Sequence, residues 1–379
     1  MKSTVLYIGK FGKSESASLT RVKNLANLII DEQISAVICS YDGGVILEVS
    51  QECKMIECAV PEYNTIGNIL EILSGKHSFE FVRKCIEKYK PKNIILYNAT
   101  FGITKKVLKY AKKSGINIFC DVTEWYEIPS IKQTAMYIYA RSVDRRIRKL
   151  DRKMDGVIAI SNYLYKYYSD IGVKTLKIPP IMDIKDEQFD YKLPYQPLRL
   201  IYAGSPGAKD LLIPVFEALS IINDKDIVIR FDLFGVSEEY VKKIWNCHEL
   251  KAVGIFCHGR VVHSQVVYEV KNAHYTVLFR KRQRYALAGY STKVCESMFL
   301  GTPVICNKIG GTDSDIQNGV TGIVLESAVT SDIVDALKWL QTIPELDYMD
   351  MRKQAKEYAK ENYSGKTYVK QLKRFLGYD

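Results

Sequence analysis

The sequence predicts an α/β protein built from two doubly wound domains. Its 379 residues are about twice the length of an ordinary domain. Short β-branched runs alternate with helical patterns, which is typical of βαβ units and parallel sheets. A proline-rich stretch at residues 177–197 interrupts this alternation, which then restarts. Two such domains would face each other across a cleft, with a substrate beyond the strand ends of each. A single large α/β domain is the alternative.

The first half alternates from its first residues onward. Its predicted strands are at residues 5–8, 36–39, 93–97, 117–121, 156–160 and 175–178. Its predicted helices are at residues 19–30, 79–89, 104–113 and 131–154. Each helix separates two strands, so we expect a parallel sheet with crossover helices.

The second half repeats the pattern. Its predicted strands are at residues 198–204, 228–234, 254–257, 276–279, 303–306 and 322–325. No strand follows the last of these, and residues 348–379 are helical, basic and aromatic. The resulting domains span residues 1–190 and 191–355, and a C-terminal helical segment spans 356–379.

Charge and cysteine content restrict the partners and the compartment. The formal net charge of +11 suits an anionic partner such as nucleic acid, an acidic membrane surface or a phosphate-bearing substrate. There is no run of about eighteen apolar residues, so no membrane-spanning helix is expected. Residues 4–9 are predicted to form a strand and not a signal peptide. The nine cysteines form no CxxC pair and fit a reducing compartment, so we expect a cytoplasmic protein.

Glycine-containing loops follow the first strand of each half. Gly9 and Gly12 follow the first strand of the N-terminal half, and Gly204 and Gly207 follow the first strand of the C-terminal half. Glycine lets backbone N–H groups approach a ligand, and the start of the next helix favours an anion. Lys209 stands at the start of the helix that follows the Gly204 loop, where it can reach a phosphate. A solvated lysine is an equally good interpretation.

The most specific pattern lies at residues 290–306. Ser291 and Thr292 precede a helical turn and leave N–H groups at its start for a diphosphate. Glu296 follows one turn later on the same face. A carboxylate there is suited to accept the two hydroxyls of a ribose. These residues predict a nucleotide site.

This stretch also carries a family resemblance. The pattern Ser-Thr-Lys-x-x-Glu-Ser-Met-x-x-Gly-Thr-Pro-Val-Ile, followed by Gly-Gly-x-x-x-x-Ile-x-x-Gly-x-x-Gly, resembles the donor half of glycosyltransferase family 4. It is similar in particular to enzymes that build bacterial capsule, exopolysaccharide or O-antigen. The resemblance is specific over residues 198–326 and general in the N-terminal half. It implies a GT-B fold, in which two Rossmann-like doubly wound domains face a central cleft. It also implies retaining transfer from a nucleotide-sugar, with a UDP-sugar favoured and no cofactor or metal required.

The resemblance implies a role for each domain and for individual residues. Residues 1–190 would bind the acceptor, residues 191–355 the donor, and residues 356–379 would pack back on the N-terminal domain. The implied donor-binding residues are Gly204, Ser205, Lys209, Arg280, Ser291, Thr292, Lys293 and Glu296. Gly9 and Gly12 would border the acceptor or the transferred sugar. Two positions depart from the family pattern: Ala288 replaces the first of two glutamates, and Ser205 replaces a basic residue. The missing glutamate leaves the identity of the donor sugar open.

Two carboxylates are catalytic candidates. Many relatives have a histidine near the reacting carbon, where this chain has Asp121 and Glu124. A carboxylate there would stabilise an oxocarbenium-like charge or accept the proton of the acceptor. The alternative is that Asp121 caps a helix and Glu124 lies on its surface.

A DxD sequence, Asp313-Ser-Asp315, matches the metal signature of the other common glycosyltransferase fold. It follows a Gly-Gly loop at a predicted helix start, where the helix dipole favours acidic residues. We interpret it as helix capping and expect no metal.

Two helices of the first half carry basic stripes. At 100° per residue one side of the first helix collects Lys105, Lys106, Lys109, Lys112 and Lys113. The next long helix has arginines at i, i+4, i+7 and i+11, namely Arg141, Arg145, Arg148 and Arg152. The opposite side is expected to face the sheet through Met136, Tyr139, Val143, Ile147, Leu150 and Met154. We predict that the basic stripes bind an anionic membrane surface; a solvated face is the alternative.

We expect a retaining glycosyltransferase that moves a sugar to a lipid-linked glycan acceptor in cell-surface polysaccharide synthesis. It would be peripherally associated with the inner face of the membrane. A sugar-nucleotide epimerase of the same architecture would bind the same ligands without an acceptor, and would not need the basic surface. A nucleic-acid-binding protein is suggested by charge alone, because no recognised module is present.

Overall fold

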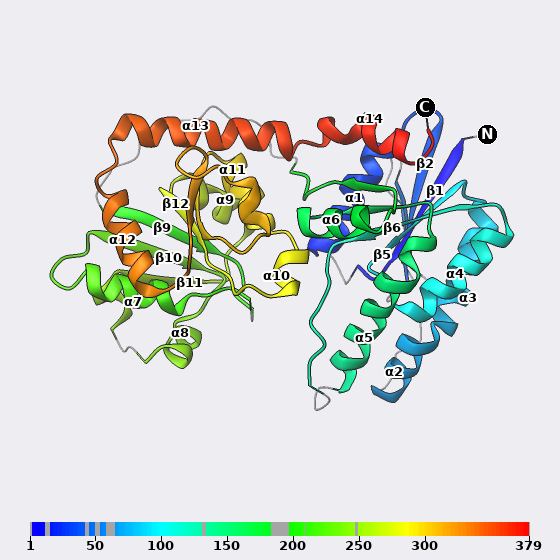
Figure 1. The fold of residues 1–379 in the computed structure, drawn as a ribbon, viewed down its shortest axis with the longest axis horizontal. Coiled ribbons are helices and arrows are strands. Elements are labelled where there is room, and N and C mark those ends of the chain that lie inside the picture. The colour runs from blue at the N-terminus through cyan, green and yellow to red at the C-terminus, as the bar shows by residue number, and fades with distance from the viewer. Residues whose placement is uncertain are drawn as a thin grey trace. The chain divides into compact units, whose positions relative to one another are not determined.

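Buried aliphatic runs form the strands of two separate sheets (Figure 1). The computed structural model describes residues 2–11, 16–41, 45–49, 54–57, 65–130, 134–182, 197–207, 209–246 and 249–378. The chain divides into two units. Unit 1 comprises Met1–Ile181, Ala288–Tyr290 and Gly365–Asp379, and unit 2 comprises Met182–Leu287 and Ser291–Ser364. The boundary predicted at residue 190 lies outside the described residues.

Unit 1 contains an eight-stranded sheet of order β4-β3-β2-β1-β5-β6-β7-β8. Its parallel strands are β1 (Ser3–Gly9), β2 (Ile34–Ser40), β5 (Asn93–Tyr97), β6 (Asn117–Val122), β7 (Gly156–Ala159) and β8 (Thr175–Lys177). Two antiparallel strands, β3 (Val45–Val49) and β4 (Lys54–Glu57), extend one edge. These two strands are not among those predicted from the sequence.

Helices cover both faces of this sheet. On one face α1 (Ala17–Ile29) and α14 (Gly365–Phe375) share a core with the strands. The other face is covered by α3 (Lys76–Tyr89), α4 (Phe101–Lys113), α5 (Thr134–Lys149) and α6 (Asn162–Asp170). A further helix, α2 (Thr65–Ser74), packs on α4 and α5. Layers on both faces explain why the strands read as continuous apolar runs.

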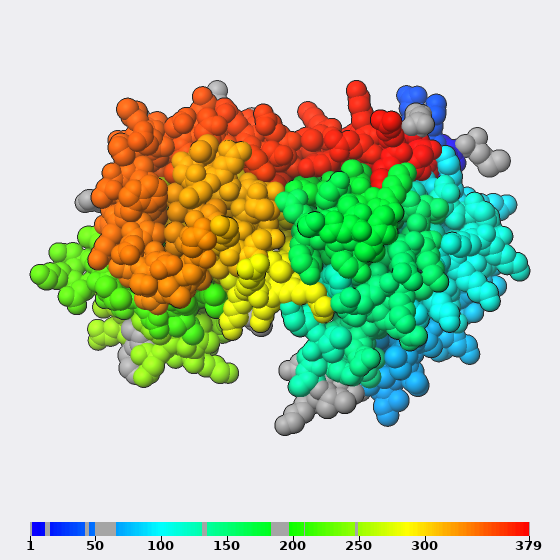
Figure 2. Space-filling model, viewed as in Figure 1, coloured from blue at the N-terminus to red at the C-terminus, as the bar shows by residue number. Residues whose placement is uncertain are grey.

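The C-terminal residues return to unit 1. Helix α13 (Glu345–Asn362) packs on α11 (Thr292–Phe299) within unit 2, whereas α14 packs on α1 within unit 1. Figure 2 shows α14, in red, lying directly on the surface of unit 1. The segment expected to pack on the N-terminal domain therefore begins at Gly365, since residues 356–362 continue α13.

Unit 2 contains a six-stranded, fully parallel sheet of order β11-β10-β9-β12-β13-β14. The strands are β9 (Leu198–Ala203), β10 (Ile229–Phe234), β11 (Ile255–Gly259), β12 (Tyr275–Leu278), β13 (Val304–Asn307) and β14 (Gly322–Leu325). Its other helices are α7 (Ile213–Ile222), α8 (Glu238–Ile244), α9 (His263–Lys271), α10 (Arg284–Ala288) and α12 (Thr330–Leu340). Counted from β9, the order is 3-2-1-4-5-6, the arrangement of dinucleotide-binding Rossmann folds. The strand order reverses between β9 and β12, and ligands bind at such a reversal, beyond the carboxyl ends of the strands.

The long helix predicted at 131–154 is shorter in the structure. Helix α5 ends at Lys149, and a 3₁₀ turn spans Asp151–Lys153. Most of the residues expected to face the sheet are buried, but Met136 is exposed because it lies in the first turn of α5, outside the core. None of the helices in the described part of the chain combines the length and the hydropathy that crossing a membrane requires.

Candidate functional site

The candidate site lies in unit 2, at the reversal between β9 and β12. Gly204 directly follows β9 with φ +122°, a conformation that only glycine adopts without strain. A Cβ on Gly204 would lie 2.8 Å from Cε of Lys293, which comes from the first turn of α11. The predicted glycine loop and the predicted helix start are therefore in direct contact.

Loop segments connect the ends of neighbouring strands at this place. Asp210 forms an antiparallel bridge with Arg280, and the Leu211 N–H donates to the Phe279 carbonyl at 2.7 Å. On the other side of β12, the Arg280 N–H donates to Oδ1 of Asn307 at 2.8 Å, and Nδ2 of Asn307 donates to the Arg280 carbonyl at 3.0 Å. These bonds fix the backbone of Arg280 between the loop that follows β9 and the end of β13.

A buried ionic cluster forms around Asp210. Its Oδ1 accepts from Nε of Arg280 at 2.9 Å, and its Oδ2 accepts from Nζ of Lys293 at 2.8 Å. The Tyr202 hydroxyl donates to Oδ2 at 2.7 Å and accepts from Nζ of Lys293 at 2.6 Å. The Asp210 side chain is 1% exposed, so the two cations and the hydroxyl replace its hydration.

The pKa values reflect both burial and the neighbouring charges. Burial lowers the pKa of the Lys293 ammonium below its ordinary value, and Arg280 and Lys209 add to this by repulsion, while Asp210 opposes them. Burial alone would raise the pKa of Asp210, but Lys293 and Arg280 outweigh it and hold that pKa below the ordinary value. Arg280 and Lys293 carry two positive charges against the one negative charge of Asp210. The cluster therefore favours an additional anion.

The start of α11 adds hydrogen-bond donors beside this cluster. Ser291 occupies the N-cap position, but its side chain makes no capping bond. Its Oγ is buried and has no hydrogen-bond partner among the described residues. The first N–H groups of a helix have no acceptor within the helix, and they attract anions. Thr292 lies in this first turn with an exposed side chain.

Glu296 lies one turn further along α11 and is partly buried. Its Oε1 is 2.8 Å from Nε2 of His263, an exposed residue at the start of α9. This bond fixes the orientation of the carboxylate. His263 was not among the predicted site residues. It lies 33 residues before Glu296 in the sequence, and only the fold brings the two side chains together.

The remaining predicted donor residues lie on the loop after β9. Ser205 is exposed, and Gly207 has φ +58°. Nζ of Lys209 lies 4.6 Å from the centre of the Tyr285 ring, a cation–π contact. Neither Tyr285 nor the central Asp210 was predicted, although Asp210 directly follows Lys209.

The DxD sequence holds a backbone turn. The Asp313 carboxylate accepts from the backbone N–H groups of Ile309, Gly310 and Gly311 at 3.2, 3.1 and 2.7 Å. Asp313 therefore caps the Gly-Gly loop, and only a short 3₁₀ turn, Thr312–Asp315, follows. In the part of the chain that the structure describes, no group of three or more His, Cys, Asp or Glu residues is placed to hold a metal ion.

In unit 1 the predicted catalytic candidate Asp121 lies in a buried ion pair. Its carboxylate is fully buried. Oδ1 accepts from Nη2 of Arg21 at 2.8 Å, and Oδ2 accepts from the Tyr7 hydroxyl at 2.7 Å. Nη1 of Arg21 donates to the Ile178 and Pro179 carbonyls at 3.1 and 3.2 Å. Asp121 thus joins β6, β1 and α1 to the end of β8, and it does not cap a helix.

Glu124 follows β6 on a loop and is partly exposed, with its carboxylate accepting a hydrogen bond from the Tyr126 hydroxyl. Gly9 ends β1, next to β5, where the strand order of unit 1 reverses. A Cβ on Gly9 would lie 2.7 Å from the Phe11 ring and 3.0 Å from Cβ of Tyr97. Gly9 therefore allows a close turn at that reversal. Gly12 lies outside the described residues.

The basic stripes of α4 and α5 are on the surface of unit 1. The exposed members are Lys105, Lys109, Lys112, Lys113, Arg141, Arg145, Arg148 and Arg152. Lys106 is partly buried beside the Phe79 ring. Arg146, on the inner side of α5, is fully buried and paired with Asp151 at 3.4 Å.

Comparison with known proteins gives a family match for the region that contains this site. Residues 183–362 match the family model described as glycosyl transferases group 1. The group 1 match covers nearly all of unit 2 and includes the Gly204 loop, the Asp210 cluster and α11. No curated protein sequence matches the chain.

Solved glycosyltransferase structures share the complete fold. A glycosyltransferase from Rickettsia africae ESF-5 is 14% identical, with a TM-score of 0.69 and 100% of both chains covered. Anabaena HepE in complex with UDP and glucose is 12% identical, with a TM-score of 0.63 and 99% of both chains covered. The lipopolysaccharide outer core galactosyltransferase WaaB is 15% identical, with a TM-score of 0.64 and 99% of both chains covered. The predicted GT-B fold, with two Rossmann-like α/β domains, is confirmed.

Proposed function

We propose that this protein is a glycosyltransferase that transfers a sugar from a UDP-sugar with retention of configuration and without a metal. The observation that carries the proposal is the excess positive charge of Arg280 and Lys293, held at the β9–β12 reversal beside the start of α11. A diphosphate matches this charge, and the buried Ser291 hydroxyl and the first N–H groups of α11 supply donors for its oxygens. The structure of the relative HepE with UDP and glucose supports a UDP-sugar as the donor.

Glu296 is the proposed ribose-binding residue. A carboxylate accepts two hydroxyl hydrogen bonds, and His263 holds this one in place from outside the helix. The loop from Ser205 to Lys209 would border the phosphates, with Gly204 allowing Lys293 to approach the strand end.

Departure of the leaving group without a metal is supported by the same charges. As the bond between the sugar and the diphosphate breaks, negative charge develops on the leaving phosphate. Lys293, Arg280 and the α11 N-terminus would stabilise that charge where a metal otherwise would. The Asp313 carboxylate accepts hydrogen bonds from three backbone N–H groups, which supports a capping role. Of the two catalytic candidates, Glu124 is the accessible carboxylate and is the one that we propose for contact with the acceptor or the developing charge.

The acceptor is proposed to be a lipid-linked glycan used in cell-surface polysaccharide synthesis. The exposed basic faces of α4 and α5 in unit 1 support this, because they suit an anionic membrane surface. The fold similarity to WaaB, a lipopolysaccharide outer core enzyme, points to the same class of acceptor. We place the protein in the cytoplasm, peripherally bound to the inner face of the membrane.

Two measurements test the proposed activity. A thermal-shift screen of nucleoside diphosphates should select UDP, because a ligand at about a hundred times its dissociation constant stabilises the folded state by roughly 2.7 kcal/mol. UDP release from a panel of UDP-sugars should then require a lipid-extract acceptor. Interconversion of UDP-sugars without an acceptor would indicate an epimerase, and no stabilisation by any nucleotide would contradict the donor site.

A further inference from the structure

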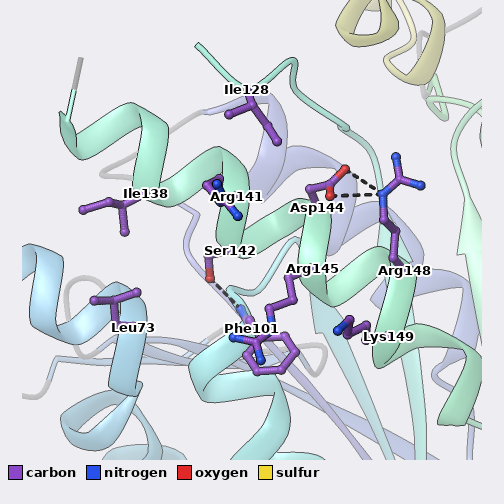
Figure 3. A pocket seen from close by; sticks show the side chains of 10 residues that line it. All are labelled: Leu73, Phe101, Ile128, Ile138, Arg141, Ser142, Asp144, Arg145, Arg148 and Lys149. Atoms are coloured by element: carbon purple, nitrogen blue, oxygen red, sulfur yellow. Dashed lines mark hydrogen bonds and ion pairs between the residues drawn. The ribbon is translucent and has the colours of Figure 1, made fainter. Parts of the chain in front are cut away.

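A hollow of about 460 Å³ lies on unit 1, outside the candidate donor site. Figure 3 shows it between α2 and α5, above the start of α4. Its lining combines apolar and basic side chains: Leu73, Phe101, Ile128, Ile138, Arg141, Ser142, Asp144, Arg145, Arg148 and Lys149. Nothing in the proposed chemistry of the donor uses these residues.

Close backbone contacts hold α2 beside the hollow. Gly75, which follows α2 with φ +57°, approaches α4 so closely that a Cβ there would lie 2.3 Å from the Ile103 nitrogen. A Cβ on Gly102 of α4 would lie 2.4 Å from the Leu73 carbonyl oxygen. From α5, the Ser142 hydroxyl accepts the N–H of Phe101 at 2.9 Å. The three helices therefore meet in one fixed arrangement.

Aromatic rings position the arginines of the hollow. The Arg145 guanidinium lies 4.3 Å from the centre of the Phe101 ring, and that of Arg141 lies 5.5 Å from the Tyr137 ring. Contact with a ring face leaves the N–H groups in the guanidinium plane available for an anion, although Nη1 of Arg141 also donates to the Tyr137 hydroxyl at 2.8 Å. Arg141, Arg145, Arg148 and Lys149 bring four positive charges against the single negative charge of Asp144, which pairs with Arg148 at 3.0 Å. The hollow therefore carries a net charge of +3.

An apolar stripe borders the basic hollow. Ile66, Leu70 and Leu73 lie at i, i+4 and i+7 on α2 and are 69%, 59% and 57% exposed. Ile128, across the hollow, is 43% exposed. Scattered exposed aliphatic residues are ordinary, but a helical stripe of them next to a cationic pocket is typical of surfaces that contact lipid.

We propose that the hollow binds the phosphate headgroup of an anionic phospholipid. Arg141 and Arg145 would bind the phosphate, and the stripe of α2 would enter the boundary between headgroups and acyl chains. The charge of the hollow matches a phosphodiester, and the bordering stripe matches the chains attached to it. This rests on the proposed membrane binding and makes it specific, because α2 supplies an apolar anchor that the lysines of α4 lack.

The test is co-sedimentation of the full chain with phosphatidylglycerol vesicles and with phosphatidylcholine vesicles. Wild-type protein should sediment with the anionic vesicles. The pair Arg141→Gln and Arg145→Gln should weaken the partition about 30-fold, at about 1 kcal/mol per basic residue. The pair Leu70→Ser and Leu73→Ser should weaken it about tenfold or more and leave the charge unchanged. Matched controls on unit 2, Lys225→Gln with Lys338→Gln, and Ile221→Ser, replace exposed side chains and should have little effect.

Three outcomes would overturn the inference. If Lys105→Gln with Lys109→Gln abolishes sedimentation while the arginine and leucine pairs do not, the membrane is bound elsewhere on unit 1. If about 10 mM inorganic phosphate displaces the protein from vesicles as well as soluble dihexanoyl phosphatidylglycerol does, the hollow is a simple phosphate site. If wild-type protein fails to sediment but still transfers sugar from a UDP-sugar, the proposal of membrane binding is wrong and the glycosyltransferase proposal stands. Thermal unfolding and UDP titration of each variant exclude misfolding as the cause of a loss.

Discussion

Lys293 and Gly204 occupy adjoining space in unit 2. Cε of Lys293 lies 2.8 Å from where a Cβ of residue 204 would be, and its Nζ lies 2.8 Å from Oδ2 of Asp210. The lysine reaches the carboxylate across a position that only glycine leaves open. The geometry of the proposed diphosphate site therefore depends on a missing side chain.

Gly204→Ala should displace Lys293 and weaken UDP binding by about tenfold or more. The alanine methyl group would overlap the lysine side chain, and φ +122° would strain it. Isothermal titration with UDP measures the loss. Gly259→Ala is the matched control, because Gly259 lies at the end of β11, outside the Ser205–Lys209 loop, and also has positive φ with nothing within 4 Å of its Cβ position. Equal losses of UDP affinity in both variants would indicate that backbone strain alone causes the effect.

The affinity for UDP should fall as the pH rises through the pKa of Lys293. Burial lowers this pKa, and a bound diphosphate would raise it, so binding favours the protonated lysine. Affinity is then greatest below the pKa of the free protein and is lost above it. The loss should begin below the ordinary lysine pKa of about 10.4, in a range where the terminal phosphate is already ionised. Titrations from about pH 7 to about pH 10 measure it.

Lys293→Arg is the control for this pH dependence, because a guanidinium remains charged throughout that range. Its affinity should be flat with pH, whatever its absolute value. An equal decline in wild type and Lys293→Arg would exclude Lys293 as the titrating group.

Glu296→Ala should weaken UDP binding by about 1.5–3 kcal/mol, the scale of hydrogen bonds to a charged group. The fold should survive, because the carboxylate is only partly buried and its described partner, His263, is exposed. Glu326→Ala is the matched control, since Glu326 is exposed and pairs with Lys308 at 3.0 Å. Wild-type affinity in Glu296→Ala would contradict the ribose assignment.

Sugar transfer should continue in excess chelator. The positive charges at the leaving group come from Lys293, Arg280 and the start of α11. Complete loss of transfer in chelator that Mg²⁺ restores would show that a metal is required.

Asp313→Ala should lower the free energy of unfolding by about 1–3 kcal/mol, because three backbone N–H groups lose their acceptor.

Asp121→Asn should lower the free energy of unfolding by about 3–5 kcal/mol, because Arg21 would remain as a buried charge without its counter-ion. Transfer per folded molecule should change little. Asp151→Asn, which breaks a second buried pair among the described residues of unit 1, is the control and should behave alike. A large fall in kcat at unchanged Tm in Asp121→Asn alone would restore the catalytic role.

Local sequence determined much of the fold and part of the donor site. Each buried parallel strand is an apolar run between helical patterns, so the two doubly wound domains could be predicted without long-range information. Ser291 to Glu296 lie on one helix, and the helical period alone places them on one side. For the same reason the exposed stripes of α4 and α5 were predictable.

The tertiary structure decided what is buried and which charges are paired. Asp210 and Lys293 are far apart in sequence, as are Asp121 and Arg21, and both pairs form only where strand ends converge. Periodicity could not predict them, because each residue alone looks like a surface charge or a cap. The apolar stripe of α2 became significant only when Gly75 and Gly102 placed it beside the arginines of α5. A sequence specifies which side chains share a helix face, whereas burial and charge pairing depend on neighbours that only the folded chain brings together.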